Sequence, residues 1–221
     1  PEDEPGFRFE RVESGLDDPG SDGVVIFADL DGDGVLDAVA SRSMGATWWQ
    51  PGRGDGSFQA PREIAAARPG TVAAMAAGDI DRDGRTDVLI GRWYRAYGSS
   101  LDAFPADLLL NRAAPSGAPE FVRTALPEDD AEFTEALDAG GRPLYGVLIA
   151  EVLDRSIAPP PQLLMLAYGR RWNRLYVGST EGWRDEAPAL GLDGDAERSG
   201  AYPEWLRERA RTDPRFDRKD E

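Results

Sequence analysis

The chain has 221 residues with 41 acidic and 25 basic side chains, which gives a formal net charge of −16. This acidic balance argues against nucleic acid and anionic membranes as partners, because both bind basic surfaces. The sequence contains neither cysteine nor histidine, which excludes disulfides, thiol chemistry and every catalytic triad that uses histidine.

The first segment of the chain repeats near the other end. Residues 6–17 align without a gap on residues 182–193, and both stretches have the pattern of an outer strand followed by an exit segment. We therefore expect residues 5–16 to be the outer strand of a preceding repeat unit, and the chain to be a segment of a longer array. Residues 1–5 do not resemble a signal peptide, so the signal of a secreted protein would lie outside this sequence.

An aspartate loop follows at residues 29–37, with aspartate at positions 1, 3, 5 and 9 and glycine at position 6. Alternate residues of a tight loop turn their carboxylates toward one centre, and Ca²⁺ takes about six to eight oxygen ligands. Gly34 can adopt the positive φ that folds the loop around an ion. The predicted ligands are Asp29, Asp31, Asp33, the backbone carbonyl of Val35, and Asp37.

The same pattern returns fifty positions later, at residues 79–87. Its predicted ligands are Asp79, Asp81, Asp83, the backbone carbonyl of Arg85, and Asp87, so the sequence predicts two Ca²⁺ sites. Four carboxylates within one short loop repel one another unless a cation compensates them. The alternative is an aspartate-rich turn that is held by Asx hydrogen bonds and binds no metal.

The flanks of both loops predict strands rather than helices. An EF-hand needs a bidentate glutamate at position 12, but this position holds Ala40 in the first copy and Ile90 in the second. Short apolar runs precede and follow each loop, which is typical of buried strands. Each metal loop is therefore expected to connect two strands.

Three copies of one four-stranded plan follow from these repeats. They cover residues 22–66, 70–126 and 142–192, and residues 200–221 are expected to form a short helix, starting near Pro203, with a mobile tail. The third copy keeps only Glu151 and Asp154 as carboxylates where its loop should lie. We expect no Ca²⁺ site there, with prolines fixing the loop shape instead.

The second unit carries a long insertion that is rich in aromatic residues. Trp93, Tyr94 and Tyr97 lie in it and are candidates for stacking on a carbohydrate. The alternative for such aromatics is packing between units, which we expect for the strand residues Trp48, Trp49 and Tyr176.

At both loops the sequence resembles a known repeat. The two stretches read FADLDGDGVLDAVA and AAGDIDRDGRTDVLIG, and they resemble the FG-GAP or VCBS repeat of integrin alpha-like β-propellers. The exit segments FERVESGLDD and WRDEAPALGLDG further resemble bacterial VCBS proteins and the cartilage acidic protein group. The resemblance implies an all-β fold of four-stranded antiparallel propeller blades. Together with the repeats described above, it predicts about three blades in this chain, an extra N-terminal outer strand and a short C-terminal helix.

The resemblance also implies an extracellular or cell-surface location and a role in adhesion or ligand binding, with calcium as a structural ion. Three blades cannot close a ring, so we expect the remaining blades of a longer chain, or a homo-oligomer, to complete it. No apolar run approaches the roughly 18 residues of a membrane span, so we expect no membrane insertion.

We therefore interpret the chain as a non-catalytic calcium-binding module whose ligand is a protein or a glycan. The alternative is a carbohydrate-binding module or an accessory domain of a polysaccharide-active enzyme. If the chain were itself an enzyme, its chemistry would rest on carboxylates, tyrosine or arginine. No nucleophile-and-base pattern is present, so we predict no catalytic residue.

Overall fold

The computed structural model describes most of the chain in twelve stretches. They are residues 11, 13–17, 20, 23–42, 44–96, 103–113, 117–127, 142–153, 161–168, 172–179, 182–194 and 204–212. None of the helices in these stretches is long and apolar enough to cross a membrane.

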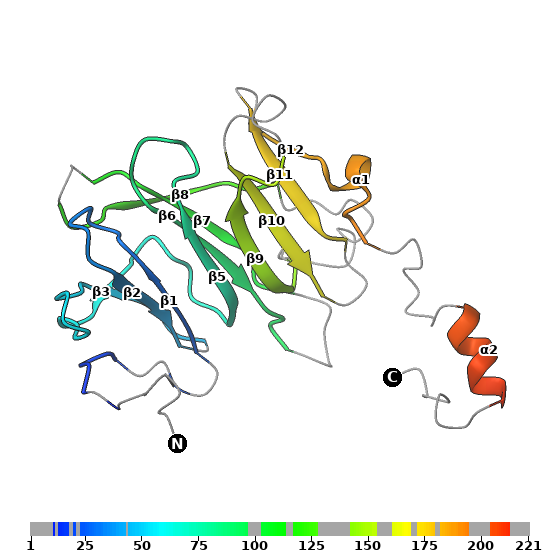
Figure 1. Cartoon of the computed structure of the whole chain (residues 1–221), viewed down its shortest axis with the longest axis horizontal. Coiled ribbons are helices and arrows are strands. Elements are labelled where there is room, and N and C mark those ends of the chain that lie inside the picture. The colour runs from blue at the N-terminus through cyan, green and yellow to red at the C-terminus, as the bar shows by residue number, and fades with distance from the viewer. Residues whose placement is uncertain are drawn as a thin grey trace, which may run out of the picture.

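The described strands form three sheets of four antiparallel strands each, in sequence order within every sheet (Figure 1). The first sheet consists of β1 (Val24–Ala28), β2 (Asp37–Ser41), β3 (Thr47–Gln50) and β4 (Arg62–Glu63). The second consists of β5 (Val72–Gly78), β6 (Asp87–Arg92), β7 (Asp107–Asn111) and β8 (Phe121–Thr124). The third consists of β9 (Leu144–Ala150), β10 (Gln162–Ala167), β11 (Arg174–Ser179) and β12 (Gly182–Asp185).

The sheets pack face to face, and β5 contacts both β1 and β9. This arrangement confirms the predicted all-β fold and fits three blades of a partial propeller. The bounds of the three repeat units stay a prediction. The described part of the expected N-terminal outer strand, residues 11 and 13–16, contains no strand. It is hydrogen-bonded to the first sheet instead, because Gln50 Nε2 of β3 donates to the Gly15 carbonyl at 3.1 Å, and Phe58 N–H in the β3–β4 connection donates to the Ser14 carbonyl at 2.8 Å.

The second sheet is buried on both faces, because the side chains of its central strands point alternately to one face and the other. Val88 and Ile90 of β6 pack in a core shared with the first sheet, while Leu89 between them packs in a core shared with the third. Successive side chains of a strand point to opposite faces, so a continuous apolar run serves two interfaces. Trp49 and Tyr176 lie in these two cores, as expected, and Trp48 is also buried.

Two glycines allow the third sheet to approach the second. A Cβ on Gly91 would lie 2.7 Å from Cγ1 of Val147, and one on Gly78 would lie 2.9 Å from Cγ2 of Ile149. Both distances are shorter than ordinary carbon contacts. Strand β9 therefore packs directly on the backbone of β5 and β6.

Two short helices follow the third sheet. Helix α1 (Ala187–Leu190) ends at Gly191 in the left-handed conformation, and its buried Ala187 packs toward β11. Helix α2 (Glu204–Thr212) lies where the sequence predicts a C-terminal helix. Pro203 and the tail beyond residue 212 lie outside the described residues.

Candidate metal centres

The first aspartate loop connects β1 to β2 and brings three carboxylates together. Oxygen atoms of Asp29, Asp31 and Asp37 all lie within 4.8 Å of one another. Asp29 closes the turn by accepting hydrogen bonds from the N–H groups of Gly32 at 2.8 Å and Gly34 at 2.9 Å. Gly34 has the positive φ, 85°, that the sequence predicts for position 6.

Asp37 forms the buried base of this loop. Its side chain is fully covered, and it accepts hydrogen bonds from Leu30 N–H at 3.0 Å and Gly52 N–H at 2.9 Å. A Cβ on Gly52 would lie 2.2 Å from the Leu36 carbonyl oxygen. Only glycine lets the chain after β3 pass so close to the loop.

The second loop repeats this geometry between β5 and β6. Carboxylate oxygens of Asp79, Asp81 and Asp87 lie within 4.8 Å of one another. Buried Asp87 accepts hydrogen bonds from Ile80 N–H at 2.9 Å and Asn111 N–H at 2.8 Å, which matches the role of Asp37. At position 4 the second loop has Arg82 with φ 61°, where the first has Gly32 with φ 74°.

The remaining predicted ligands lie beside these groups. Asp33 and Asp83, at position 5, each accept a hydrogen bond from the N–H two residues later, at 2.8 Å from Val35 and 3.0 Å from Arg85. The structure thus gathers three of the four predicted carboxylates in each loop. Ligation by any of these aspartates, and by the carbonyls of Val35 and Arg85, stays a prediction.

The carboxylates destabilise one another's charged forms. Burial raises the pKa of Asp87 to about 6, and the charges of Asp81 and Asp83 add to this effect. Burial also raises the pKa of Asp37 and, together with the charge of Asp37, that of Asp31. Burial disfavours charge unless an opposite charge lies nearby, and a bound cation would supply such a charge at the bases of both loops.

The donor set fits a hard cation, because every candidate ligand atom is oxygen. Each carboxylate oxygen has two lone pairs. Those of Asp37 each accept one backbone N–H, as do those of Asp87, so each of these oxygens keeps capacity for a metal bond. Both loops therefore pass the chemical test for holding Ca²⁺.

The third sheet closes its corresponding loop with an amide. Gln162 is the first residue of β10, the place that Asp37 has in β2 and Asp87 in β6. Its buried Oε1 accepts hydrogen bonds from Val152 N–H at 2.7 Å and Leu153 N–H at 2.9 Å. A neutral group therefore replaces the carboxylate at the base of this loop. Sequence reasoning missed this residue, although its place before an apolar strand was the available signal.

The two acidic residues that remain in the third copy do not form a carboxylate cluster within the described residues. Glu151 forms an ion pair with Arg82 of the second loop at 3.2 Å. Asp154, Pro159 and Pro160 lie outside the described residues, so the role predicted for the prolines stays a prediction.

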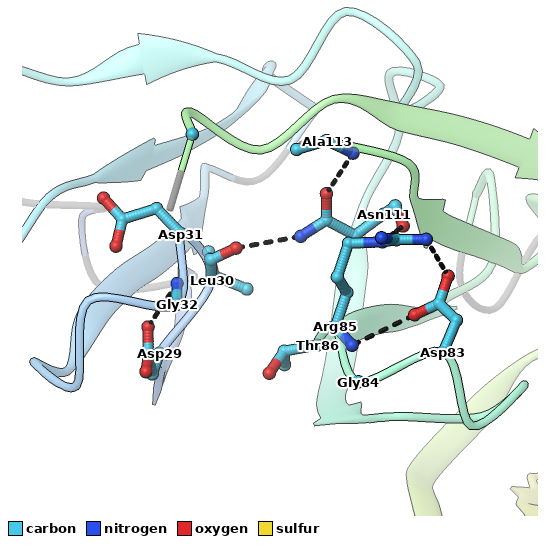
Figure 2. A pocket seen from close by; sticks show the side chains of 11 residues that line it. Asp29, Leu30, Asp31, Gly32, Asp83, Gly84, Arg85, Thr86, Asn111 and Ala113 are labelled. Atoms are coloured by element: carbon cyan, nitrogen blue, oxygen red, sulfur yellow. Dashed lines mark hydrogen bonds and ion pairs between the residues drawn. The ribbon is translucent and has the colours of Figure 1, made fainter. Parts of the chain in front are cut away.

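A pocket of about 260 Å³ separates the two aspartate loops (Figure 2). Asn111 spans it by donating a 2.8 Å hydrogen bond from Nδ2 to the Leu30 carbonyl. Arg85 lies on the opposite side beside Asp83, and its Nε donates to the Asn111 carbonyl at 2.9 Å. The two loops are thus neighbours that share Asn111.

The predicted aromatic site is part of a larger cluster between the second and third sheets. Trp93 lies 5.1 Å from Tyr145 and 4.9 Å from Tyr168, measured between ring centroids, and Tyr94 lies 5.4 Å from Trp93. Tyr94 is buried, whereas Tyr145 is 63% exposed. Tyr97 lies outside the described residues. Sequence reasoning missed Tyr145 of β9 and Tyr168, which follows β10, because both are distant from Trp93 in the sequence.

Comparison with known proteins supports the repeat. Residues 29–90 match the family model described as FG-GAP-like repeat, a stretch that contains both aspartate loops. No curated protein matches the chain.

Proposed function

With residues 29–90 matching an FG-GAP-like repeat, we propose that the chain is a non-catalytic propeller module that binds two structural Ca²⁺ ions. Asp29, Asp31 and Asp37 would hold one ion, and Asp79, Asp81 and Asp87 the other. The ions would supply positive charge at the β1–β2 and β5–β6 connections. The side chains would fix the loop around each ion, because they already accept the backbone N–H groups that shape it.

The observation that carries this proposal is the position of the buried aspartates. Asx hydrogen bonds account for the turns at Asp29 and Asp31 without any metal. Backbone N–H groups of Leu30 and Gly52 hold a third, buried carboxylate within 4.8 Å of those two, and no Asx turn compensates the charge that this adds. Two unit charges at that distance repel by about 3 kcal/mol at an effective dielectric constant of about 20. A divalent cation converts this repulsion into attraction.

Thermal unfolding tests the proposal. Binding to the folded state alone stabilises it by RT ln(1 + [Ca²⁺]/Kd), about 1 to 3 kcal/mol per loop for millimolar calcium and a sub-millimolar site. We expect calcium to raise the Tm of chelator-treated protein, and Asp31→Asn and Asp81→Asn each to remove part of that rise. Asp55→Asn is the matched control, because Asp55 lies in an exposed turn outside both loops. A Tm that is the same in calcium and in chelator would refute the proposal.

We further propose that the module acts outside the cell, in adhesion or ligand binding. Millimolar extracellular calcium would saturate both loops, and FG-GAP repeats are typical of extracellular proteins. The ligand class is protein or glycan. The test is immobilised-ligand binding with and without calcium, using the double variant Asp31→Asn, Asp81→Asn as a control. Localisation of the tagged natural protein inside the cell would contradict the location.

The open array of sheets favours completion by further blades, either from a longer chain or from a second copy. Light scattering of the purified chain separates these cases. A dimer or larger assembly supports completion by copies, and a monomer contradicts it.

A second candidate function is carbohydrate binding at the aromatic cluster. Tyr145 is 63% exposed beside Trp93, and exposed aromatic faces stack on sugar rings. Tyr145→Ala and Trp93→Ala should each abolish retention of the polysaccharides that the parent chain binds. Trp205→Ala is the matched control, because Trp205 is equally exposed on α2. A parent chain that binds no glycan on an array would exclude this function.

A further inference from the structure

The second aspartate loop has a positive side chain in contact with its carboxylates. Arg112 follows directly after β7, and its Nη1 lies 2.6 Å from Asp81 Oδ2 and 2.8 Å from Asp83 Oδ2. Arg85 of the same loop pairs with Asp83 Oδ2 as well. One guanidinium thus bridges two of the four carboxylates that are predicted to bind the ion.

The first loop has no such partner among the described residues. Gly52 and Asn111 have the same role, since each donates its N–H to the position 9 aspartate of its own loop. The residue after each is an arginine, Arg53 in the first sheet and Arg112 in the second. Arg53 is exposed, and no described ion pair joins it to the first loop. The two sheets therefore place the same residue type in equivalent positions with different contacts.

Position 7 of the loop also gives the second loop more positive charge than the first. It is Val35 in the first loop and Arg85 in the second. If only the four aspartates and the arginines paired with them are counted, the first loop has four carboxylates and a charge of −4. The second has four carboxylates and two paired arginines, which gives −4 + 2 = −2. The charge of the ligand set is a main determinant of affinity for Ca²⁺.

We propose that Arg112, with Arg85, is an internal counter-cation of the second loop that weakens its affinity for Ca²⁺ and keeps the loop ordered without the ion. This inference rests on the proposed function, because it presupposes that both loops bind Ca²⁺. The ion and Arg112 compete for Asp81 and Asp83, whereas no described residue competes with Ca²⁺ in this way at the first loop. The first site then fills at lower calcium concentration than the second.

Calorimetric titration with Ca²⁺ of proteins that keep one site tests the inference. Asp31→Asn isolates the second site and Asp81→Asn isolates the first. We expect the isolated second site to have the larger Kd. Adding Arg112→Gln to Asp31→Asn should lower that Kd by about tenfold, because the competing charge is gone. Adding Arg53→Gln to Asp81→Asn should leave the Kd of the first site unchanged within about twofold.

The Tm and a second variant, Arg112→Lys, test the inference even if Arg112→Gln folds poorly. In chelator, Arg112→Gln should lower the Tm more than Arg53→Gln, and it should enlarge the rise in Tm on adding calcium. Arg112→Lys keeps the charge but not the two-way guanidinium contact, and we expect an intermediate Kd. An unchanged or larger Kd for both Arg112 variants at the second site overturns the inference. Absence of calcium binding at the first site as well would instead refute the proposed function.

Discussion

Asn111 donates a 2.8 Å hydrogen bond from its side chain to the Leu30 carbonyl, which joins the second sheet to the aspartate loop of the first. The backbone N–H of Asn111 also donates to Asp87, and the N–H of Leu30 donates to Asp37. A continuous set of hydrogen bonds therefore connects the buried carboxylates of the two loops. All four residues are buried, and buried polar groups are nearly always hydrogen-bonded.

Replacing Asn111 with alanine should destabilise the fold. The change leaves the Leu30 carbonyl without this donor and removes the acceptor of the N–H groups of Ala113 and Glu120. An unsatisfied buried polar group costs about 1 to 3 kcal/mol. Urea unfolding in saturating calcium measures the loss. Gln59→Ala is the control, because only the backbone of Gln59 takes part in the described hydrogen bonds. A loss no larger than that of the control would contradict this role for Asn111.

Gln162 should be needed as a neutral acceptor. Gln162→Ala removes the partner of Val152 N–H and Leu153 N–H, and we expect a loss of about 1 to 3 kcal/mol in the free energy of unfolding. Gln162→Glu keeps the shape but adds a buried charge, which should destabilise the protein at pH 7 and less so at pH 5. Chemical denaturation at both pH values tests this. If Gln162→Glu matched the parent at pH 7 in chelator, the neutral role would be wrong.

The calcium-free protein should lose stability as the pH rises through about 6. The folded pKa of Asp87 is about 6, above the value of about 3.9 for an unfolded aspartate, so the folded state binds this proton more tightly. The contribution is complete below pH 3.9 and is lost above pH 6, on the order of 3 kcal/mol in all.

The difference in unfolding free energy between the parent and Asp87→Asn isolates this effect, because asparagine does not titrate. In chelator, the parent should become less stable relative to Asp87→Asn as the pH rises from 5 to 7.5. Saturating calcium should reverse the trend, because the ion binds the ionised carboxylate. A pH-independent difference in chelator would show that Asp87 is not perturbed.

The packing of β9 on the second sheet should depend on Gly91. A Cβ there would lie 2.7 Å from Val147 Cγ1, so Gly91→Ala forces one strand to move, at a cost of about 1 to 3 kcal/mol. Val147→Ala creates the missing space. The double variant should therefore be more stable than the sum of the single changes predicts. If the changes in unfolding free energy of the two single variants were strictly additive, the two residues would not be in contact.

Several features of the fold follow from short-range patterns in the sequence. The spacing of aspartate and glycine in residues 29–37 and 79–87 predicts both loops, and the apolar flanks predict strands on either side. The continuous run at Val88, Leu89 and Ile90 predicts a strand buried on both faces, because each face of β6 has its own core. These signals are local, and the structure agrees with them.

The features that sequence reasoning missed depend on contacts across the fold. The partners of Arg112 are about thirty positions earlier in the chain, so the residues beside Arg112 do not predict them. Tyr145 and Tyr168 join Trp93 only because β9 packs on the second sheet. In the sequence, Gln162 is only a polar residue at the start of a strand. Its role follows from the hydrogen bonds that Val152 N–H and Leu153 N–H donate to it. Pairing across sheets determines these roles.

The most direct test of the account is the number of Ca²⁺ ions that the folded chain binds. Native mass spectrometry of chelator-treated protein after addition of calcium counts them. We predict two ions on the parent chain, one on Asp31→Asn, one on Asp81→Asn and none on the double variant. A parent chain that stays free of calcium, or a double variant that binds as many ions as the parent, would contradict the assignment of the two aspartate loops as calcium sites.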